Sequence, residues 1–82
     1  MPGAIIGRIP KGKSDEVRIS LESYKGQDLI DVRLFMRLSD PSGEIIATKK
    51  GVSLPIDCLP DLAGAIQKAM EEAQRRGLLK AS

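Results

Sequence analysis

The fold of this chain is decided by residues 24–54, which read YKGQDLIDVRLFMRLSDPSGEIIATKKGVSL. Lys25-Gly26 is typical of a tight two-residue turn, because glycine readily takes a positive φ. Residues 40–43 place proline second and glycine fourth, the pattern of a β-turn. Gly51 interrupts the last strand-like run and indicates a bulge or a close backbone approach. The stretch therefore predicts two consecutive β-hairpins.

The strand expected between the two turns, from Leu29 to about Leu38, divides its side chains between two faces. The expected core face holds Ile30, Val32, Leu34, Met36 and Leu38. The other face holds Leu29, Asp31, Arg33, Phe35 and Arg37, so one aromatic ring lies between two guanidinium groups. Residues 17–22 also alternate and predict another strand. Residues 4–9 predict a short first strand, and residues 10–15 a loop.

From Ile56 the apolar spacing changes to three and four residues, which is typical of an amphipathic helix of about 20 residues, roughly 30 Å long. Pro60 is tolerated in the first turn of a helix, and Gly77 predicts the end of the helix. Such a helix is longer than one small sheet can cover, so we infer that a second copy of the chain covers its far end. The expected dimer contacts are Leu59, Leu62, Ile66, Met70 and Ala73.

The composition limits the classes of protein that the chain could belong to. Its 82 residues suffice for one domain. A single cysteine, Cys58, excludes an internal disulfide and fits an intracellular protein, cytoplasmic in a bacterium or phage-infected cell and nuclear in a eukaryote. No apolar run approaches the ~20 residues of a membrane span. With no histidine and no evident catalytic constellation, we expect no enzyme, no metal site and no cofactor.

The net charge of +2 says less than its distribution. Residues 1–13 hold three cations and no acid, so they are either a basic arm that tracks phosphates or an ordinary solvated terminus. We divide the chain into this arm with its short first strand (1–13), a sheet-plus-helix domain (14–77) and a C-terminal tail (78–82).

Single-strand binders combine a basic groove with aromatic faces on which bases stack. The two aromatic residues, Tyr24 and Phe35, both lie beside cations. The pattern alone also fits an ordinary polar sheet face with one core-filling phenylalanine.

Four of these pieces, in this order and spacing, resemble the positive cofactor 4 family of transcriptional coactivators. They are Tyr24-Lys25-Gly26, Ile30-Asp31-Val32-Arg33, the turn at 40–44 and the basic strand at 49–54. The resemblance covers about residues 5–75. It implies an α+β fold in which a curved four-stranded antiparallel sheet is followed by one helix. It also implies a homodimer whose paired sheets form a channel for single-stranded DNA.

The resemblance also implies particular contacts. The stacking aromatic before the first turn corresponds to Tyr24, and basic positions correspond to Arg8, Lys25, Arg33 and the pair Lys49-Lys50. The nucleic-acid contacts expected from pattern and resemblance together are Arg8, Tyr24, Lys25, Arg33, Phe35, Arg37, Lys49 and Lys50.

The chain departs from the family pattern at four places. Met36 stands where the family often has tryptophan, Gln27 replaces a lysine, residues 10–15 are an insertion, and Leu59 replaces a second tryptophan. The compact chain is more similar to bacterial or phage members than to nuclear ones.

The sequence thus predicts a homodimer that binds single-stranded DNA, with little sequence preference, in transcription regulation or in DNA replication and repair. RNA is a possible second ligand, and transcription or replication proteins are possible partners. The alternative is a dimeric protein-interaction module in which nucleic-acid binding is incidental.

Overall fold

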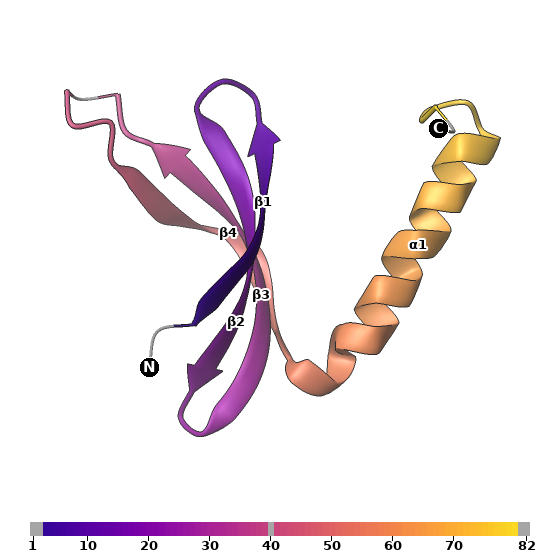
Figure 1. Ribbon diagram of the computed structural model, residues 1–82, viewed down its shortest axis with the longest axis horizontal. Helices are drawn as coiled ribbons and strands as arrows, with labels where there is room; N and C mark the ends of the chain where they lie inside the picture. Colours follow the sequence, from indigo (N-terminus) through magenta and orange to yellow (C-terminus); the bar gives the residue numbers. More distant parts are fainter. Residues whose placement is uncertain (1–2, 40, 81–82) are drawn as a thin grey trace.

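A computed structural model describes residues 3–39 and 41–80. Four strands form one antiparallel sheet in the order β1-β2-β3-β4, with each strand hydrogen-bonded to its neighbour in sequence (Figure 1). A short 3-10 helix, η1, leads into one α-helix, α1. The elements are β1 (Ala4–Lys11), β2 (Asp15–Tyr24), β3 (Gln27–Arg37), β4 (Ile45–Pro55), η1 (Ile56–Cys58) and α1 (Leu59–Arg75). The four-stranded antiparallel sheet with one C-terminal helix is the predicted fold.

The turn between β2 and β3 has the expected two-residue form. Lys25 and Gly26 have φ values of 51° and 78°, and two positive φ values are the requirement of a type I′ turn. In the turn between β3 and β4, Gly43 has a φ of 61°, and the Leu38 amide donates to the Glu44 carbonyl over 2.7 Å. Asp40, the first residue of the turn predicted there, lies outside the described residues.

The loop predicted over residues 10–15 is shorter than expected. β1 continues to Lys11 and β2 begins at Asp15, so only residues 12–14 turn the chain. Pro10 had suggested a strand break, but β1 is an edge strand, where a residue without an N–H group is tolerated. The segment expected as a basic arm is therefore paired with β2 from Ala4 onward, and residues 1 and 2 lie outside the described residues.

The helix begins later and is shorter than the spacing predicted. α1 has 17 residues, because the first turn after β4 is the 3-10 helix η1, and proline stands in the first turn of α1. Its end has the hydrogen bonds of a Schellman motif, with Gly77 at a φ of 74°. The Gly77 amide donates to the Gln74 carbonyl (3.0 Å) and the Leu78 amide to the Ala73 carbonyl (2.8 Å). Gly77 thus ends the helix as predicted.

Directly opposed residues of an antiparallel sheet share a face, so the strand register defines two faces. One face, the apolar face, carries Ile9, Val17, Ile19, Leu21, Ile30, Val32, Leu34, Met36, Ile46, Val52 and Leu54. The other, the arginine face, carries Arg8, Glu16, Arg18, Asp31, Arg33, Phe35 and Arg37. Among the described apolar side chains, only Ile30 is fully buried, with 3% of its surface exposed.

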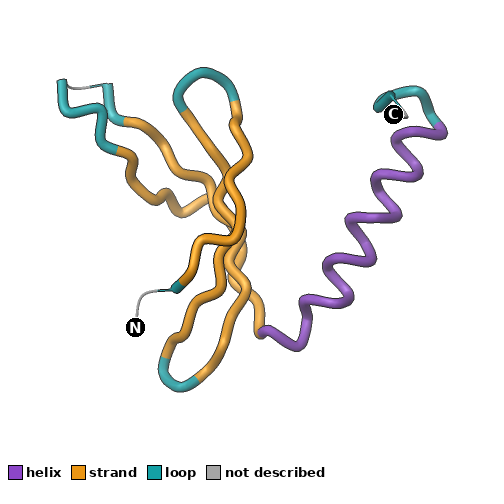
Figure 2. The backbone as a smooth tube through the Cα atoms, in the orientation of Figure 1, coloured by secondary structure: helices purple, strands orange, loops and turns teal. Residues whose placement is uncertain are grey.

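The helix stands apart from the sheet and is joined to it through η1 (Figures 1 and 2). No residue of α1, all of which is described, is buried. Ile66 is 55% exposed and Met70 is 44% exposed. A single chain therefore leaves the apolar stripe of its helix uncovered. Within the described residues, α1 is also too short and too polar to cross a bilayer.

Candidate nucleic-acid interface

Three arginines lie side by side across the sheet. Arg8 on β1 is opposite Arg18 on β2, and Arg18 is opposite Arg33 on β3. We call these three residues the arginine row. Like charges directly opposite one another destabilise a sheet unless counter-charges lie near. Glu16 and Asp31 supply those counter-charges from the same face.

Glu16 pairs with two members of the arginine row. The Arg18 Nε donates a hydrogen bond to the Glu16 carboxylate, and the Arg8 Nε lies 3.9 Å from the same oxygen, Oε2. The hydrogen bond from Arg18 lowers the pKa of Glu16 below its ordinary value, and the charges of Arg18, Arg8 and Arg37 act in the same direction. Glu16 is therefore ionised at neutral pH and pairs with cations from two strands.

Phe35 lies beneath one of these cations. The Arg18 Cζ is 4.3 Å from the centre of the Phe35 ring, within the range of a cation–π contact. On the same strand, the Arg37 Nη1 donates to the Gly43 carbonyl over 2.7 Å and so ties the end of β3 to the following turn. The aromatic ring that the sequence places between Arg33 and Arg37 thus has Arg18, from the neighbouring strand, stacked on it.

Arg33 is held by β4 as well as by its own strand. Its Nε and Nη2 donate to the Asp31 carboxylate over 3.1 and 2.9 Å, and its Nη1 donates to the Thr48 carbonyl over 3.1 Å. The Ser53 hydroxyl donates to the same Asp31 carboxylate. Burial would raise the pKa of Asp31, but the bonds from Arg33 and Ser53 outweigh it and lower the pKa. Most of the Arg33 donors are therefore engaged within the protein.

The hydrogen bond from Arg33 to the Thr48 carbonyl fixes a bulge in β4. Three residues, 48–50, lie opposite Leu34, because the pairing shifts between Arg33–Gly51 and Phe35–Ala47. The Thr48 hydroxyl donates to the Leu34 carbonyl (2.8 Å) and accepts from the Lys50 amide (3.1 Å). These bonds hold the backbone that carries Lys49 and Lys50.

Gly51 follows the bulge, where β4 approaches β3 closely. A Cβ atom there would lie 2.5 Å from the Val32 carbonyl oxygen and 2.8 Å from the Arg33 Cα. No side chain fits in that space, so the predicted close backbone approach is confirmed.

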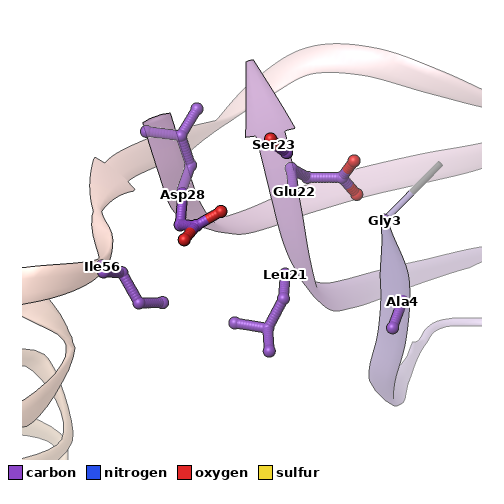
Figure 3. Close-up of a pocket in the computed structure, with 8 residues that line it drawn as sticks. Gly3, Ala4, Leu21, Glu22, Ser23, Asp28 and Ile56 are labelled. Atoms are coloured by element: carbon purple, nitrogen blue, oxygen red, sulfur yellow. The ribbon is translucent and has the colours of Figure 1, made fainter. Parts of the chain in front are cut away.

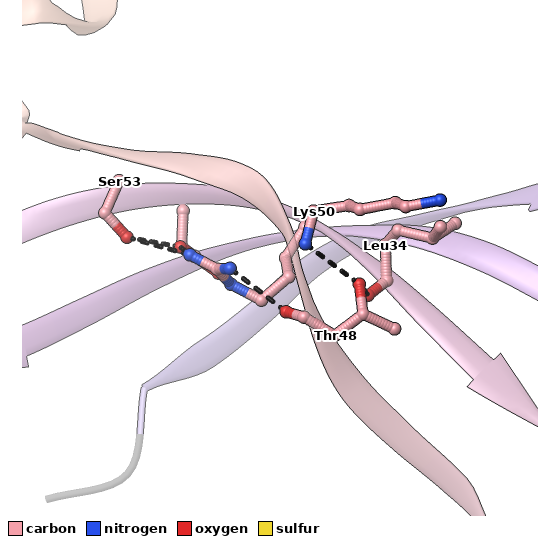
Figure 4. A network of polar contacts seen from close by, with 6 residues as sticks. Leu34, Thr48, Lys50 and Ser53 are labelled. Carbon is pink, nitrogen blue, oxygen red and sulfur yellow. Dashed lines mark hydrogen bonds and ion pairs between the residues drawn. The ribbon is translucent and has the colours of Figure 1, made fainter.

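The lysines of the bulge are both exposed, and Lys50 extends away from the polar network (Figure 4). Lys50 borders a hollow of about 310 Å³ together with Val17, Val32 and Leu34, which belong to the apolar face. Lys11 and Arg33 also line this hollow, so Lys50 lies near one member of the arginine row.

Tyr24 and Lys25 lie at the end of the sheet where the chain turns from β2 into β3. Tyr24 is 62% exposed, and the Lys25 Nζ lies 5.3 Å from the centre of its ring. The structure thus groups the predicted contact residues in three places. Arg8, Arg33, Phe35 and Arg37 lie on the arginine face, Lys49 and Lys50 on the bulge, and Tyr24 and Lys25 on the turn.

A second hollow, of about 380 Å³, lies where η1 meets the sheet (Figure 3). Leu21 and Ile56 line it, and the carboxylates of Glu22 and Asp28 lie beside it. This acidic and apolar surface does not suit a phosphate backbone. In residues 3–39 and 41–80, no group of three or more possible ligands gathers to hold a metal ion.

Arg18 and Asp31 were not among the predicted site residues. Arg18 has a weak signal in the sequence, because it is one polar residue in an alternating strand, and Asp31 belongs to the motif at residues 30–33 but had no predicted contact of its own. Only the pairing of β2 with β3 and of β3 with β4 shows that Arg18 stacks on Phe35 and that Asp31 reaches Ser53.

A meander of four antiparallel strands followed by one C-terminal helix is the fold of the PC4-like class of α+β proteins. The chain belongs to the Transcriptional Coactivator p15 (PC4) family, whose model matches residues 11–65. No curated protein matches the chain.

Solved structures similar to this one include a bacterial and a phage homologue of PC4. A PC4 homologue from Burkholderia pseudomallei is 28% identical with a TM-score of 0.75, covering 87% of this chain and 93% of that chain. A bacteriophage T5 homologue of the eukaryotic transcription coactivator PC4, implicated in recombination-dependent DNA replication, is 21% identical with a TM-score of 0.63. That match covers 98% of this chain and 96% of that chain, and at this identity it shows the fold alone.

Proposed function

We propose that this protein is a homodimeric single-stranded DNA-binding protein with little sequence preference, which acts in transcription regulation or in DNA replication and repair. The observation that carries the proposal is the arginine face, where Arg18 stacks on Phe35 and Arg33 and Arg37 flank the ring. Guanidinium groups bind phosphates, and both arginine and aromatic planes stack on bases. Bases are accessible for such stacking in a single strand and not in a duplex.

The contacts divide by location. The Lys49 and Lys50 ammonium groups contact phosphates along the edge of the sheet, and Lys25 does so at the turn. Tyr24 and Phe35 stack on bases. Arg8 and Arg37 contact phosphates from the arginine face, and Arg33 contributes its remaining donor while it holds the bulge in place. Membership in a family of transcriptional coactivators supports a nucleic-acid role for this sheet.

The cellular process is proposed from two sources. The family is one of transcriptional coactivators, and the bacteriophage T5 homologue is implicated in recombination-dependent DNA replication. Both processes expose single strands. We therefore place the protein where DNA is unwound, in the bacterial or phage-infected cytoplasm or in a eukaryotic nucleus, and without enzymatic activity of its own.

Fluorescence anisotropy tests the proposal directly. A labelled single strand of about 20 nucleotides and the matching duplex are titrated with protein across a salt series. We expect tighter binding to the single strand, with an affinity that falls steeply as the salt concentration rises. A labelled RNA of the same sequence shows whether RNA competes. Equal, weak and salt-insensitive binding to every probe would refute the proposal.

The double substitution Lys49→Ala with Lys50→Ala tests the bulge. We expect weaker binding and a salt slope that is shallower by about one to two units, because each lost phosphate contact removes about 0.7 units on a single strand. The matched control is Lys68→Ala with Lys80→Ala, which removes the same charge at one residue within α1 and one residue after it. An equal loss in both variants would assign the effect to net charge and remove the bulge lysines from the interface.

A dimeric protein-interaction module is the second candidate function. It is favoured by the apolar surface that one chain leaves exposed on α1 and by the hollow beside Leu21 and Ile56. The salt series separates the two candidates. A weak complex with a shallow salt slope supports the interaction module, and a tight complex with a steep slope supports DNA binding.

A further inference from the structure

One acidic side chain lies among the cations of the arginine face. The Glu16 Oε2 accepts a hydrogen bond from the Arg18 Nε and lies 3.9 Å from the Arg8 Nε. Two guanidinium groups on adjacent strands that converge on one anionic oxygen are also an arrangement that binds a phosphate. In this structure, that position is filled by the protein's own carboxylate.

We propose that Arg8 and Arg18 form a phosphate site that Glu16 occupies in the free protein, so that Glu16 competes with the nucleic-acid backbone for both arginines. The proposal rests on the proposed function, because the ligand is a phosphate of the same single strand. It assigns a binding role to Arg18 and a regulating role to Glu16.

The surroundings of the three residues suit an exchange of ligands. The Arg8 side chain is 60% exposed and projects from an edge strand, so a phosphate can reach it. Arg18 is 18% exposed and rests on the Phe35 ring, which fixes its guanidinium in place for an incoming anion. The Glu16 side chain is 21% exposed, so a displaced carboxylate can turn toward solvent and be rehydrated.

The balance of interaction energies also favours displacement of the Glu16 carboxylate by a phosphate. Ion pairs at a protein surface contribute little to stability, because water and salt screen the charges. A backbone phosphate brings the release of condensed counterions in addition to its charge, which the carboxylate cannot offer. Nucleic acid can therefore displace Glu16, but the lost pairing subtracts from the affinity.

Glu16→Gln removes the competitor and keeps the shape of the side chain. Glu71→Gln on α1 makes the same change in net charge far from the sheet and is the control (Figure 1). In anisotropy titrations with a dT oligomer, we expect Glu16→Gln to bind about five-fold tighter, and Glu71→Gln less than about two-fold tighter. An equal gain in both variants, or no gain, would overturn the proposal.

A double-mutant cycle tests whether the gain passes through Arg18. In the Arg18→Gln background the position is already disrupted, so Glu16→Gln should give less than half of its logarithmic gain. A full gain in that background would overturn the assignment of Arg18.

A third measurement uses the unaltered protein and avoids any question of folding. The pKa of Glu16 is lowered by Arg18, and Arg8 and Arg37 also face its carboxylate. If a phosphate takes over Arg18, saturation with dT oligomer should raise the Glu16 pKa toward its ordinary value, as followed by NMR of its side-chain carboxyl carbon. An unchanged or further lowered pKa would overturn the proposal. Tight binding of wild-type protein with no response at Glu16 refutes this inference alone, and absence of binding refutes the proposed function itself.

Discussion

Lys25 combines an unfavourable backbone conformation with a proposed contact to DNA. Its φ of 51° lies in the left-handed region, which costs a residue with a Cβ atom about 1 kcal/mol. Its side chain is a proposed phosphate contact. Lys25→Asn relieves the backbone and removes the charge, so we expect the free energy of unfolding to rise by up to about 1 kcal/mol while the affinity for single-stranded DNA falls.

Urea unfolding and anisotropy measure the two effects of Lys25→Asn separately. Lys25→Gln is the control, because it removes the same charge and keeps a side chain that disfavours a positive φ. That variant should lose affinity without gaining stability. Wild-type affinity in both variants would remove Lys25 from the DNA contacts.

Two glycines of the chain predict opposite responses to the same substitution. At Gly51 a methyl group would overlap the backbone of β3, with contacts of 2.5 and 2.8 Å, so Gly51→Ala should lower the free energy of unfolding by about 2 kcal/mol. Gly64 lies in α1 with open space around its Cβ position. Gly64→Ala should therefore raise that free energy by about 0.5–1 kcal/mol. Thermal or urea unfolding checks both, and a neutral Gly51→Ala would contradict the close approach of the two strands.

At the scale of the element, β4 depends on a buried carboxylate of β3. Asp31 accepts bonds from Arg33 and Ser53, and Arg33 in turn binds the Thr48 carbonyl of the bulge. Asp31→Asn leaves the cation without its partner, and we expect a loss of about 1–3 kcal/mol in the free energy of unfolding at neutral pH. We also expect weaker DNA binding, because the bulge presents Lys49 and Lys50. The control is Asp28→Asn, which makes the same change at an exposed carboxylate of the same strand.

The pH dependence gives this prediction a second readout. The pKa of Asp31 is lower in the folded protein than in the unfolded chain, whose value is about 3.9. The folded state therefore binds fewer protons, and its stabilisation by Asp31 is full above the unfolded pKa and is lost as the pH falls through the folded pKa. Urea unfolding at pH 7 and along an acid series should show the gap between wild type and Asp31→Asn closing as the pH falls. A constant gap would mean that the charge of Asp31 is not what holds the bulge.

The elements were predictable to the extent that their signals are local. The turn at Lys25-Gly26 and the stop at Gly77 follow from backbone preferences of single residues, and the structure confirms both. The loop predicted around Pro10 was too long, because the tolerance of an edge strand for proline depends on the order of the strands. The stacking of Arg18 on Phe35 depends on cross-strand register, which no local pattern encodes.

At the scale of the whole molecule, a single chain leaves much of its apolar surface exposed to solvent. The sheet has an apolar face and α1 has an apolar stripe, but the two elements are joined through η1 and scarcely touch (Figure 1). Only one apolar side chain of the described residues is fully buried. A stable fold of this size needs more burial than that, and a second copy is the simplest source.

The proposed dimer makes stability depend on protein concentration. The stripe on α1 comprises Leu59, Leu62, Ile66, Met70 and Ala73, whose contacts with a partner remain a prediction. Ile66→Gln places an amide in the middle of that stripe, so we expect dissociation and a lower urea midpoint, since a monomer loses the burial that the partner provides. Lys68→Gln, on the opposite side of the helix, should leave the dimer and the urea midpoint unchanged. Sedimentation equilibrium and urea unfolding at several concentrations measure the two effects. A wild-type midpoint that does not move with concentration, together with a monomeric mass, would contradict the dimer and leave the apolar stripe to a different protein partner.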